Sequence, residues 1–377
     1  MPPYLDPGFD IPALPGTKEA EIETPALALD LDAMEANLAL MAARAAAAGV
    51  ALRPHAKCHR TPEIALMQMA AGASGVCCQK VAEAEAMVRA GIPDVLLTND
   101  LVDPRKMARA ARLARRARIT VICDDPTMIP AWSAAAGAEG VTLPMLVEID
   151  AGSAACGIDP GAPAAALAQA IEAAPHLRFA GLQAYAGVAQ HLRSPNERRA
   201  FVADAAERVR ETLAALQAVG LSCDWITGGG TGTWEFEAEG PWTEVQCGSY
   251  LFMDADYQAN TAAEGQAMGE FRNSLFLLTT VISKARPTVA MTDAGLKSQT
   301  MESGPPRVFE RPELTALGCA DEHCRISDPE NVLRLGDRLR LVPGHCDPTI
   351  NLHDTLVGLR NGRVERLLPV AARGRSW

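Results

Sequence analysis

The sequence lacks an excess of basic residues. Its 35 Lys and Arg residues stand against 46 Asp and Glu residues, which gives a formal net charge of −11. This balance argues against a binding surface for nucleic acid or for an anionic membrane. No stretch reaches the roughly 20 consecutive apolar residues of a membrane span, and the segment that begins at Met1 has no basic stretch followed by an apolar one, as a secretory signal would. We therefore expect a soluble, cytoplasmic protein with no nucleic-acid or membrane partner.

The ten cysteines lack the short, even spacing of a disulfide framework. Reduced thiols are the expectation for a cytoplasmic chain with this pattern. At 377 residues the chain exceeds one minimal domain. It suits a large barrel joined to a smaller domain.

Residues 27–265 alternate short apolar runs with longer, alanine-rich amphipathic segments. Such alternation is typical of an α/β fold with a parallel sheet, and eight repeats favour a closed (β/α)₈ TIM barrel. The eight expected strands are residues 51–53, 75–78, 94–97, 119–122, 143–149, 179–184, 223–226 and 244–247.

Residues 266–377 have a different pattern, with strand-like runs between Gly, Pro and Asp turns and no helical runs. This pattern predicts a C-terminal antiparallel β domain. The proline-rich residues 1–26 are expected to run along it. The expected strands are residues 275–284, 288–292, 332–342 and 354–368.

Lys57 lies in a cluster of basic and imidazole groups, Arg53-Pro54-His55-Ala56-Lys57-Cys58-His59-Arg60, directly after the first expected barrel strand. At the rim of a barrel, partial burial and neighbouring cations would both lower the pKa of this lysine and free its amine to attack an aldehyde. The segment alone leaves a Schiff-base lysine and an ordinary loop lysine equally open.

A glycine run, Thr227-Gly228-Gly229-Gly230-Thr231-Gly232-Thr233, follows the seventh expected strand. Clustered glycines let backbone N–H groups converge on an anion, and barrels often bind phosphate after strands seven and eight. A dinucleotide-binding fold is disfavoured because the third glycine of its motif is missing and no helix start follows. A loop that only turns the chain is the alternative. The residues predicted to hold a phosphate, and with Lys57 to fit pyridoxal 5′-phosphate (PLP), are Gly228, Gly229, Gly230, Thr231, Ser249 and Tyr250.

His345 and Asp347 form the second sharp feature, within Pro343-Gly344-His345-Cys346-Asp347. On an extended segment, residues i and i+2 project to one side, so the two side chains could share a divalent ion. Nitrogen plus carboxylate favours Mn²⁺, with Mg²⁺ or Co²⁺ as alternatives, and so few ligands suit a Lewis acid. Without further context, such a pair is more often a loop histidine beside a solvated acid.

These motifs, in this order, resemble the D-threonine aldolase and D-serine dehydratase family, whose members are relatives of alanine racemase. The resemblance implies PLP on Lys57, Tyr185 beside the cofactor, His191 as the catalytic base, and His345 with Asp347 as metal ligands. It also implies a homodimer. It rests on the Lys57 segment, residues 80–85, residues 148–157, Tyr185 to His191, the glycine run and the His345 segment.

Two positions refine the resemblance. Asp347 stands where the dehydratase branch has Cys, which favours the aldolase branch, and Ala155 replaces an arginine of the family. We expect a PLP- and metal-dependent enzyme that cleaves β-hydroxy-D-α-amino acids, converting D-threonine to glycine and acetaldehyde. The alternatives are a dehydratase of D-serine or D-threo-3-hydroxyaspartate, and a non-enzymatic PLP carrier. A carrier would need neither the β domain nor the His345 segment.

Overall fold

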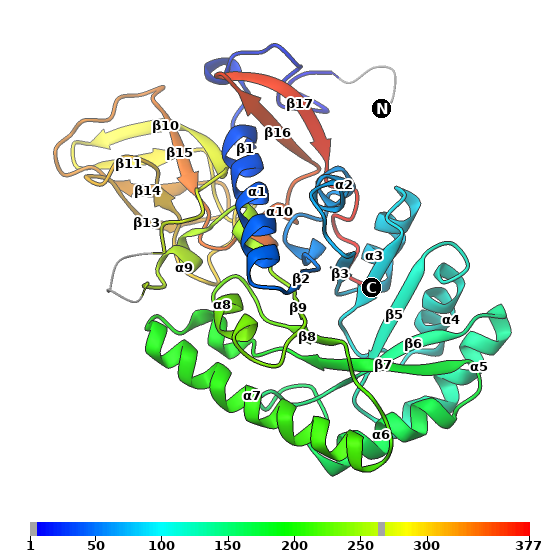
Figure 1. The fold of residues 1–377 in the computed structure, drawn as a ribbon. Coiled ribbons are helices and arrows are strands. Elements are labelled where there is room, and N and C mark those ends of the chain that lie inside the picture. Colours follow the sequence, from blue (N-terminus) through cyan, green and yellow to red (C-terminus); the bar gives the residue numbers. More distant parts are fainter. Residues whose placement is uncertain (1–5, 263–267) are drawn as a thin grey trace.

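The computed structural model describes residues 6–262 and 268–377, and its strands form two sheets (Figure 1). The first sheet has eight parallel strands in the order β2-β9-β8-β7-β6-β5-β4-β3. A bridge between His55 and Cys77 joins its two edge strands, so the sheet closes into a barrel and the predicted (β/α)₈ fold is confirmed. The strands are β2 (Ala51–Leu52), β3 (Val76–Cys78), β4 (Asp94–Leu97), β5 (Arg118–Cys123), β6 (Leu143–Glu148), β7 (Leu177–Ala184), β8 (Ile226–Gly228) and β9 (Glu244–Val245).

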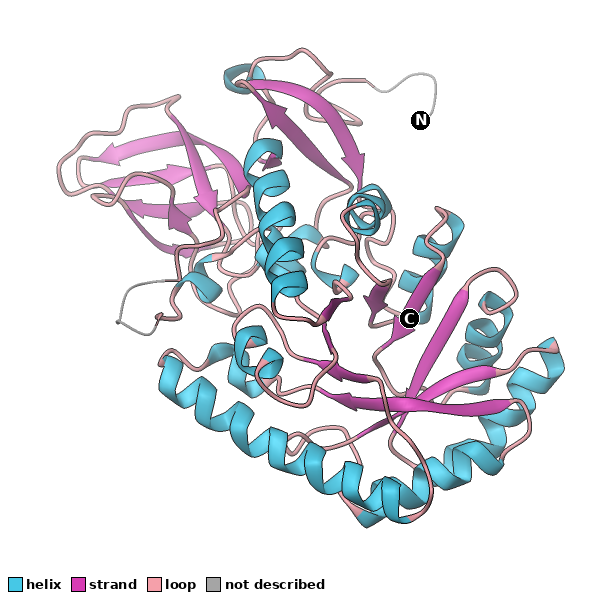
Figure 2. Cartoon of the chain, viewed as in Figure 1, coloured by secondary structure: helices cyan, strands magenta, loops and turns pink. Residues whose placement is uncertain are grey.

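Helices lie along the outer side of the barrel (Figure 2). Their starts follow local signals: Pro104 opens α4, and the carboxylate of Asp103 before it accepts a hydrogen bond from the Arg105 amide at 2.9 Å. Within the described ranges, no helix is both long and apolar enough to cross a membrane. The helices are α1 (Leu31–Ala47), α2 (Pro62–Ala70), α3 (Val81–Arg89), α4 (Pro104–Leu113), α5 (Ile129–Glu139), α6 (Ala162–Ala173), α7 (Pro195–Ala218), α8 (Trp234–Ala238), α9 (Ala255–Gln258) and α10 (Cys346–Ile350).

Two local features around the glycine run differ from the prediction. The seventh barrel strand, β8, occupies Ile226–Gly228 rather than residues 223–226, so the first glycine of the run is the last residue of the strand. A five-residue helix, α8, follows the run at Trp234, where no helix start was expected. The missing third glycine is therefore the remaining sequence argument against a dinucleotide-binding fold.

The second sheet contains nine strands and is mostly antiparallel, as predicted. Its first strand, β1, pairs antiparallel with β10 and parallel with β16, so the predicted boundary at residue 27 lies inside a strand of this sheet. Residues 16–19 hydrogen-bond to the β16–β17 hairpin. The strands are β1 (Ala26–Asp30), β10 (Leu275–Arg286), β11 (Val289–Thr292), β12 (Arg307–Val308), β13 (Thr315–Cys319), β14 (Cys324–Ser327), β15 (Arg338–Val342), β16 (Thr355–Arg360) and β17 (Arg363–Pro369).

A buried ion network fills the N-terminal end of the barrel. Arg53 Nε donates to Glu244 Oε1 at 2.9 Å, and Arg53 Nη1 donates to Asp94 Oδ1 at 2.7 Å. Trp225 Nε1 donates to the same Glu244 oxygen at 3.0 Å. The side chains of Arg53 and Glu244 are each 4% exposed, so this end of the barrel is closed to water.

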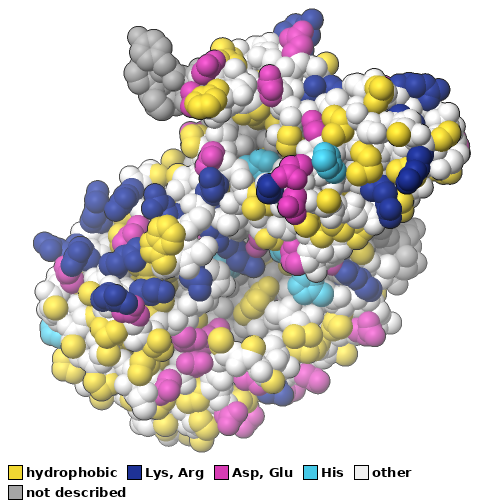
Figure 3. Space-filling view, turned by 180° about the vertical axis from the view of Figure 1, so that it is seen from behind, with side chains coloured by type: hydrophobic (Ala, Val, Ile, Leu, Met, Phe, Trp, Pro, Cys, Tyr) yellow, Lys and Arg dark blue, Asp and Glu magenta, His cyan; other side chains and the backbone are white. Residues whose placement is uncertain are grey.

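Lys and Arg side chains gather on one side of the barrel domain, where α4 lies (Figure 3). Carboxylates from the same helix or from neighbouring elements pair with several of them. The pairs include Arg105–Asp103, Arg109–Glu85, Arg112–Glu139 and Arg118–Asp94.

Candidate active site

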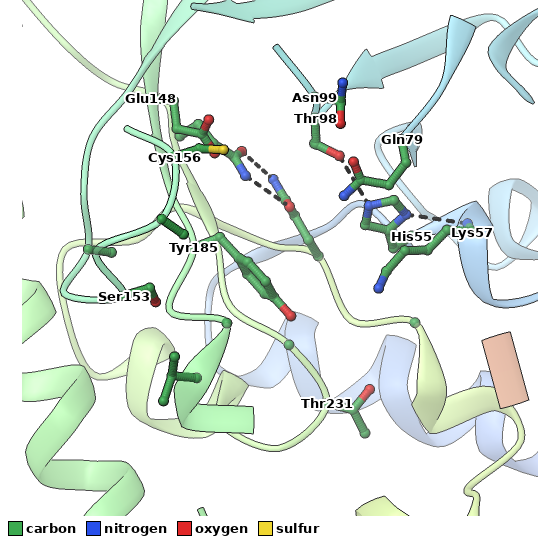
Figure 4. A pocket seen from close by; sticks show the side chains of 18 of the residues that line it. His55, Lys57, Gln79, Thr98, Asn99, Glu148, Ser153, Cys156, Tyr185 and Thr231 are labelled. Carbon is green, nitrogen blue, oxygen red and sulfur yellow. Dashed lines mark hydrogen bonds between the residues drawn. The ribbon is translucent and has the colours of Figure 1, made fainter. Parts of the chain in front are cut away.

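A cavity of about 480 Å³ opens at the C-terminal ends of the barrel strands. Lys57 and His55, which follow β2, lie on one side of it (Figure 4). Glu148 and Cys156 lie on the opposite side, and Tyr185 lies between the two sides. The structure therefore brings the predicted lysine and the predicted cofactor neighbour into one cavity.

Lys57 faces a carboxylate rather than a group of cations. Its Nζ lies 3.2 Å from Oδ2 of Asp347, which comes from the second domain. The charge of Asp347 raises the pKa of Lys57 above its ordinary value, and it outweighs partial burial, which acts in the opposite direction. The expected fall in the pKa of Lys57 was wrong. The neighbouring His55 stays neutral, because burial and Lys57 hold its pKa well below the ordinary value.

His345 and Asp347 lie close together, but not on an extended segment. His345 is the N-cap of α10, and Asp347 lies in its first turn. His345 Nε2 is 3.9 Å from Asp347 Oδ1, while His345 Nδ1 lies 2.7 Å from Oδ2 of the buried Asp254. Burial lowers the pKa of His345, but the hydrogen bond to Asp254 and the charge of Asp347 raise it to about 9.

His191 lies beside this centre, at the end of a 3₁₀ turn over Val188–His191, and its side chain is 52% exposed. Its Nδ1 is 2.7 Å from Asp256 Oδ2. Its ring centroid is 6.0 Å from that of Tyr257, which lines the cavity and lies 6.4 Å from the His345 ring. Tyr257 thus neighbours both the predicted base and the predicted metal ligand.

Sequence reasoning missed Asp254, Asp256 and Tyr257. All three lie in or directly before α9, which comes after the last barrel strand. The signal that could have found them is a pair of acids two residues apart, followed by a tyrosine, at the active rim of a barrel.

The glycine run contributes unequally to the cavity. Gly230, Thr231 and Ser249 line it, whereas the Tyr250 side chain is buried against Phe271 at a centroid distance of 5.7 Å. A Cβ on Gly230 would lie 2.5 Å from Oε1 of Gln190, so a larger residue would displace a side chain that is hydrogen-bonded to Gly232 and Thr233. Gly229 has φ +70°, and Gly228 belongs to β8, so both shape the turn rather than line the cavity.

Ala155 lines the cavity wall that also carries Asp100, Glu148 and Cys156. Burial and the nearby charge of Asp100 raise the pKa of Glu148 to about 9, so this carboxyl holds a proton at neutral pH. The family's arginine would be a cation at this wall. Its replacement by Ala155 leaves the wall acidic.

These residues fit both groups that the sequence predicts. An amine, the buried hydroxyls of Thr231 and Ser249, and a glycine without room for a Cβ surround a cavity of suitable size for PLP. Asp254 holds Nδ1 of His345 and leaves Nε2 on the side of Asp347, which is the usual arrangement behind a metal-binding histidine.

Comparison with protein families decides the relationship. The model of the alanine racemase N-terminal domain matches residues 29–256, and the model of the serine dehydratase domain matches residues 274–359. The chain belongs to the alanine-racemase-like D-threonine aldolase and D-serine dehydratase family. PLP is the cofactor of this family.

The relatives of this family member include two kinds of aldolase. The 3-hydroxy-D-aspartate aldolase of Paracoccus denitrificans (strain Pd 1222) is 48% identical over 98% of this chain and 97% of that protein. The D-threonine aldolase of Arthrobacter sp. is 48% identical over 97% and 96%. The D-threo-3-hydroxyaspartate dehydratase of Delftia sp. (strain HT23) is 30% identical over 87% and 92%. The crystal structure of D-threonine aldolase from Filomicrobium marinum superposes with a TM-score of 0.94 and 46% identity over 97% of this chain and 100% of that chain.

Proposed function

We propose that this protein is a PLP- and divalent-metal-dependent D-threonine aldolase, which cleaves β-hydroxy-D-α-amino acids between Cα and Cβ. The observation that carries the proposal is the meeting of two domains. Lys57 from the barrel lies 3.2 Å from Asp347, and Asp347 lies 3.9 Å from His345. Cofactor lysine and metal ligands would therefore act on one substrate.

The chain's own groups divide the work. Lys57, Thr231, Ser249 and the backbone at Gly230 would hold PLP, and His345 with Asp347 would hold Mn²⁺, with Mg²⁺ or Co²⁺ as alternatives. When bound, PLP supplies an electron sink for the carbanion at Cα, and the ion supplies a Lewis acid. His191, whose Nε2 is left free by the contact of Nδ1 with Asp256, would accept the proton of the substrate's β-hydroxyl.

The cavity favours an uncharged β-substituent. Among the described residues that line it, Lys57 is the only lysine or arginine, and Asp100, Glu148 and Asp150 line the opposite wall. The β-carboxylate of 3-hydroxy-D-aspartate would find no free cation there. We infer that D-threonine has a higher kcat/KM than 3-hydroxy-D-aspartate.

Product analysis after chelation and metal add-back tests this function. D-threonine with PLP and Mn²⁺ should give glycine and acetaldehyde, and chelator should stop glycine release until Mn²⁺ is returned. Ammonia and a keto acid would instead identify a dehydratase. Undiminished cleavage without any metal would contradict the metal's role, and PLP binding without turnover of any β-hydroxy-D-amino acid would identify a carrier.

We also propose a homodimer, in which the second domain of one subunit faces the barrel mouth of the other. Its basis is the resemblance to alanine-racemase-like enzymes, together with an open cavity rim on which Val188 is 50% exposed. Light scattering should give twice the chain mass of 39.9 kDa. A fully active species at the mass of a single chain would contradict the proposal.

A further inference from the structure

The short helix α9 lies behind both histidines of the site. Asp254 is its N-cap, and Asp256 lies in its first turn. Asp254 contacts Nδ1 of His345, and Asp256 contacts Nδ1 of His191, each at 2.7 Å. In both histidines the carboxylate contacts Nδ1. Nε2 is therefore the ring nitrogen that remains available in each of them.

The contact at His191 is built to orient the ring. Asp256 is buried, and its second carboxylate oxygen pairs with Arg193, so the acid itself is held firmly. Burial raises the pKa of Asp256, but hydrogen bonds from His191 and Arg193 lower it to about 2, so the acid remains ionised. The His191 side chain is half exposed, and an exposed imidazole needs no buried partner in order to be solvated. The bond therefore restricts the tautomer and rotamer of the ring.

The contact at His345 is more deeply buried. The side chain of Asp254 has no exposed surface, and its Oδ2 also accepts the Cys346 amide at 2.9 Å. Its Oδ1 accepts the Tyr257 amide at 3.0 Å and so begins α9. One carboxylate thus fixes the imidazole, the start of α10 and the start of α9 together.

We propose that Asp254 and Asp256 are positioning residues that set the tautomers of the two histidines, so that Nε2 of His345 faces the metal position and Nε2 of His191 is the proton acceptor. This inference rests on the proposed function. Because both acids belong to one helical turn, that turn also fixes the spacing between the base and the metal ligand, and Tyr257 of the same turn neighbours both rings.

Imidazole ¹⁵N NMR of the metal-free full chain tests the tautomers without reference to activity. The spectra are recorded at about pH 10, so that His345, whose pKa is raised to about 9, is neutral and has a defined tautomer. His191→Gln and His345→Gln assign the two signals by their loss. In the parent protein, both rings should carry a proton on Nδ1. Asp256→Asn should alter the pattern of His191 alone, and Asp254→Ser should alter that of His345 alone. Serine is chosen because it remains a good N-cap for α9.

Metal binding and kinetics separate the two acids. In the PLP-loaded protein, Asp254→Ser should weaken Mn²⁺ binding, followed by electron paramagnetic resonance, by roughly 10- to 100-fold. Asp256→Asn should leave Mn²⁺ affinity unchanged and lower kcat for D-threonine by about 10²-fold with little change in KM. Asp256→Glu, which keeps the carboxylate, should recover part of kcat.

The outcomes distinguish this inference from the function on which it rests. If D-threonine is not cleaved but the two tautomers change as expected, the proposed function fails and the positioning roles stand. If cleavage occurs and neither tautomer responds, the positioning roles are wrong. Equal losses of thermal stability, Mn²⁺ affinity and kcat in both variants, with unchanged tautomers, would show that the acids only support the fold.

Discussion

Arg53 and Lys57 are four residues apart, and they lie at opposite ends of the barrel. Arg53 is 4% exposed and is bonded to two carboxylates, those of Glu244 and Asp94. Lys57 is 39% exposed and, among the residues that the structure describes, pairs with one carboxylate, that of Asp347 from the other domain. The first cation has its hydrogen bonds filled by the barrel itself, which stabilises the fold. The second remains accessible from the cavity and is available for chemistry.

Polar side chains connect the two ends through the middle of the barrel. Thr227 donates to Glu244 at 2.9 Å, and Gln246 donates to Thr227 at 2.9 Å and to Gln183 at 2.7 Å. Gln183 and Gln246 both line the cavity. Hydrogen bonds therefore connect the buried ions at the N-terminal end of the barrel to Gln183 and Gln246, which line the cavity. These bonds hold the cavity-lining side chains in fixed positions.

The largest expected effect is at Lys57. Lys57→Ala and Lys57→Arg should each lower kcat/KM for D-threonine by at least ~10³-fold, because neither leaves an amine to bind the cofactor covalently. For Lys57→Arg the free energy of unfolding should change by less than about 1 kcal/mol, because a cation remains beside Asp347 and the lysine side chain is partly exposed. Steady-state kinetics and urea unfolding measure the two effects.

Lys57→Arg is the matched variant, because it keeps a cation beside Asp347. Borohydride reduction of the PLP-loaded parent should attach the cofactor to Lys57, as read by peptide mapping. A label on Lys80 or Lys297 instead would assign the cofactor lysine elsewhere.

At Arg53 we expect a large effect on stability, in contrast to the effect on activity expected at Lys57. Arg53→Met should lower the free energy of unfolding by about 3–5 kcal/mol, because it leaves the buried carboxylate of Glu244 without its cation. Arg118→Ala is the matched control: Arg118 also pairs with Asp94, at 3.6 Å, but its side chain is 58% exposed. It should cost less than about 1 kcal/mol. Equal losses in the two variants would contradict the division between the ends of the barrel.

The barrel could be predicted from the sequence because buried parallel strands read as apolar runs between amphipathic helices. The second sheet was harder. Its strands β13 and β14 alternate in exposure, and a register shift lies between Ala316 and Gly318, so they lack a continuous apolar signal. The start of β15 was placed six residues too early, at Val332, where turns precede Arg338.

Some residues of the site could also be predicted from the sequence, and others could not. Lys57, Tyr185, Gly230 and Asp347 come from local motifs, and they meet in one cavity. The contacts between the histidines and the acids of α9 span 65 and 91 residues, so no local pattern contains them. The direction of the pKa shift at Lys57 was wrong for the same reason, since Asp347 is remote in the sequence.

The smallest expected effect concerns Glu148, which lies at the active end like Lys57 but is neutral there. Its pKa is raised from 4.5 to about 9 in the folded protein, so the folded state binds a proton that the unfolded state releases as the pH rises above 4.5. Stability from this group is therefore full below pH 4.5 and is lost progressively towards pH 9. Glu148→Gln needs no proton, so its advantage over the parent should grow between pH 5 and pH 8. Partial solvent exposure limits this gain to the order of 1 kcal/mol.

Urea unfolding of the cofactor-free proteins at both pH values measures this gain in stability, with the exposed Glu207→Gln as a control that should show no such growth. A constant difference between Glu148→Gln and the parent across this range would mean that Glu148 is ionised in the folded protein, and the acidic wall beside Ala155 would then carry a full charge.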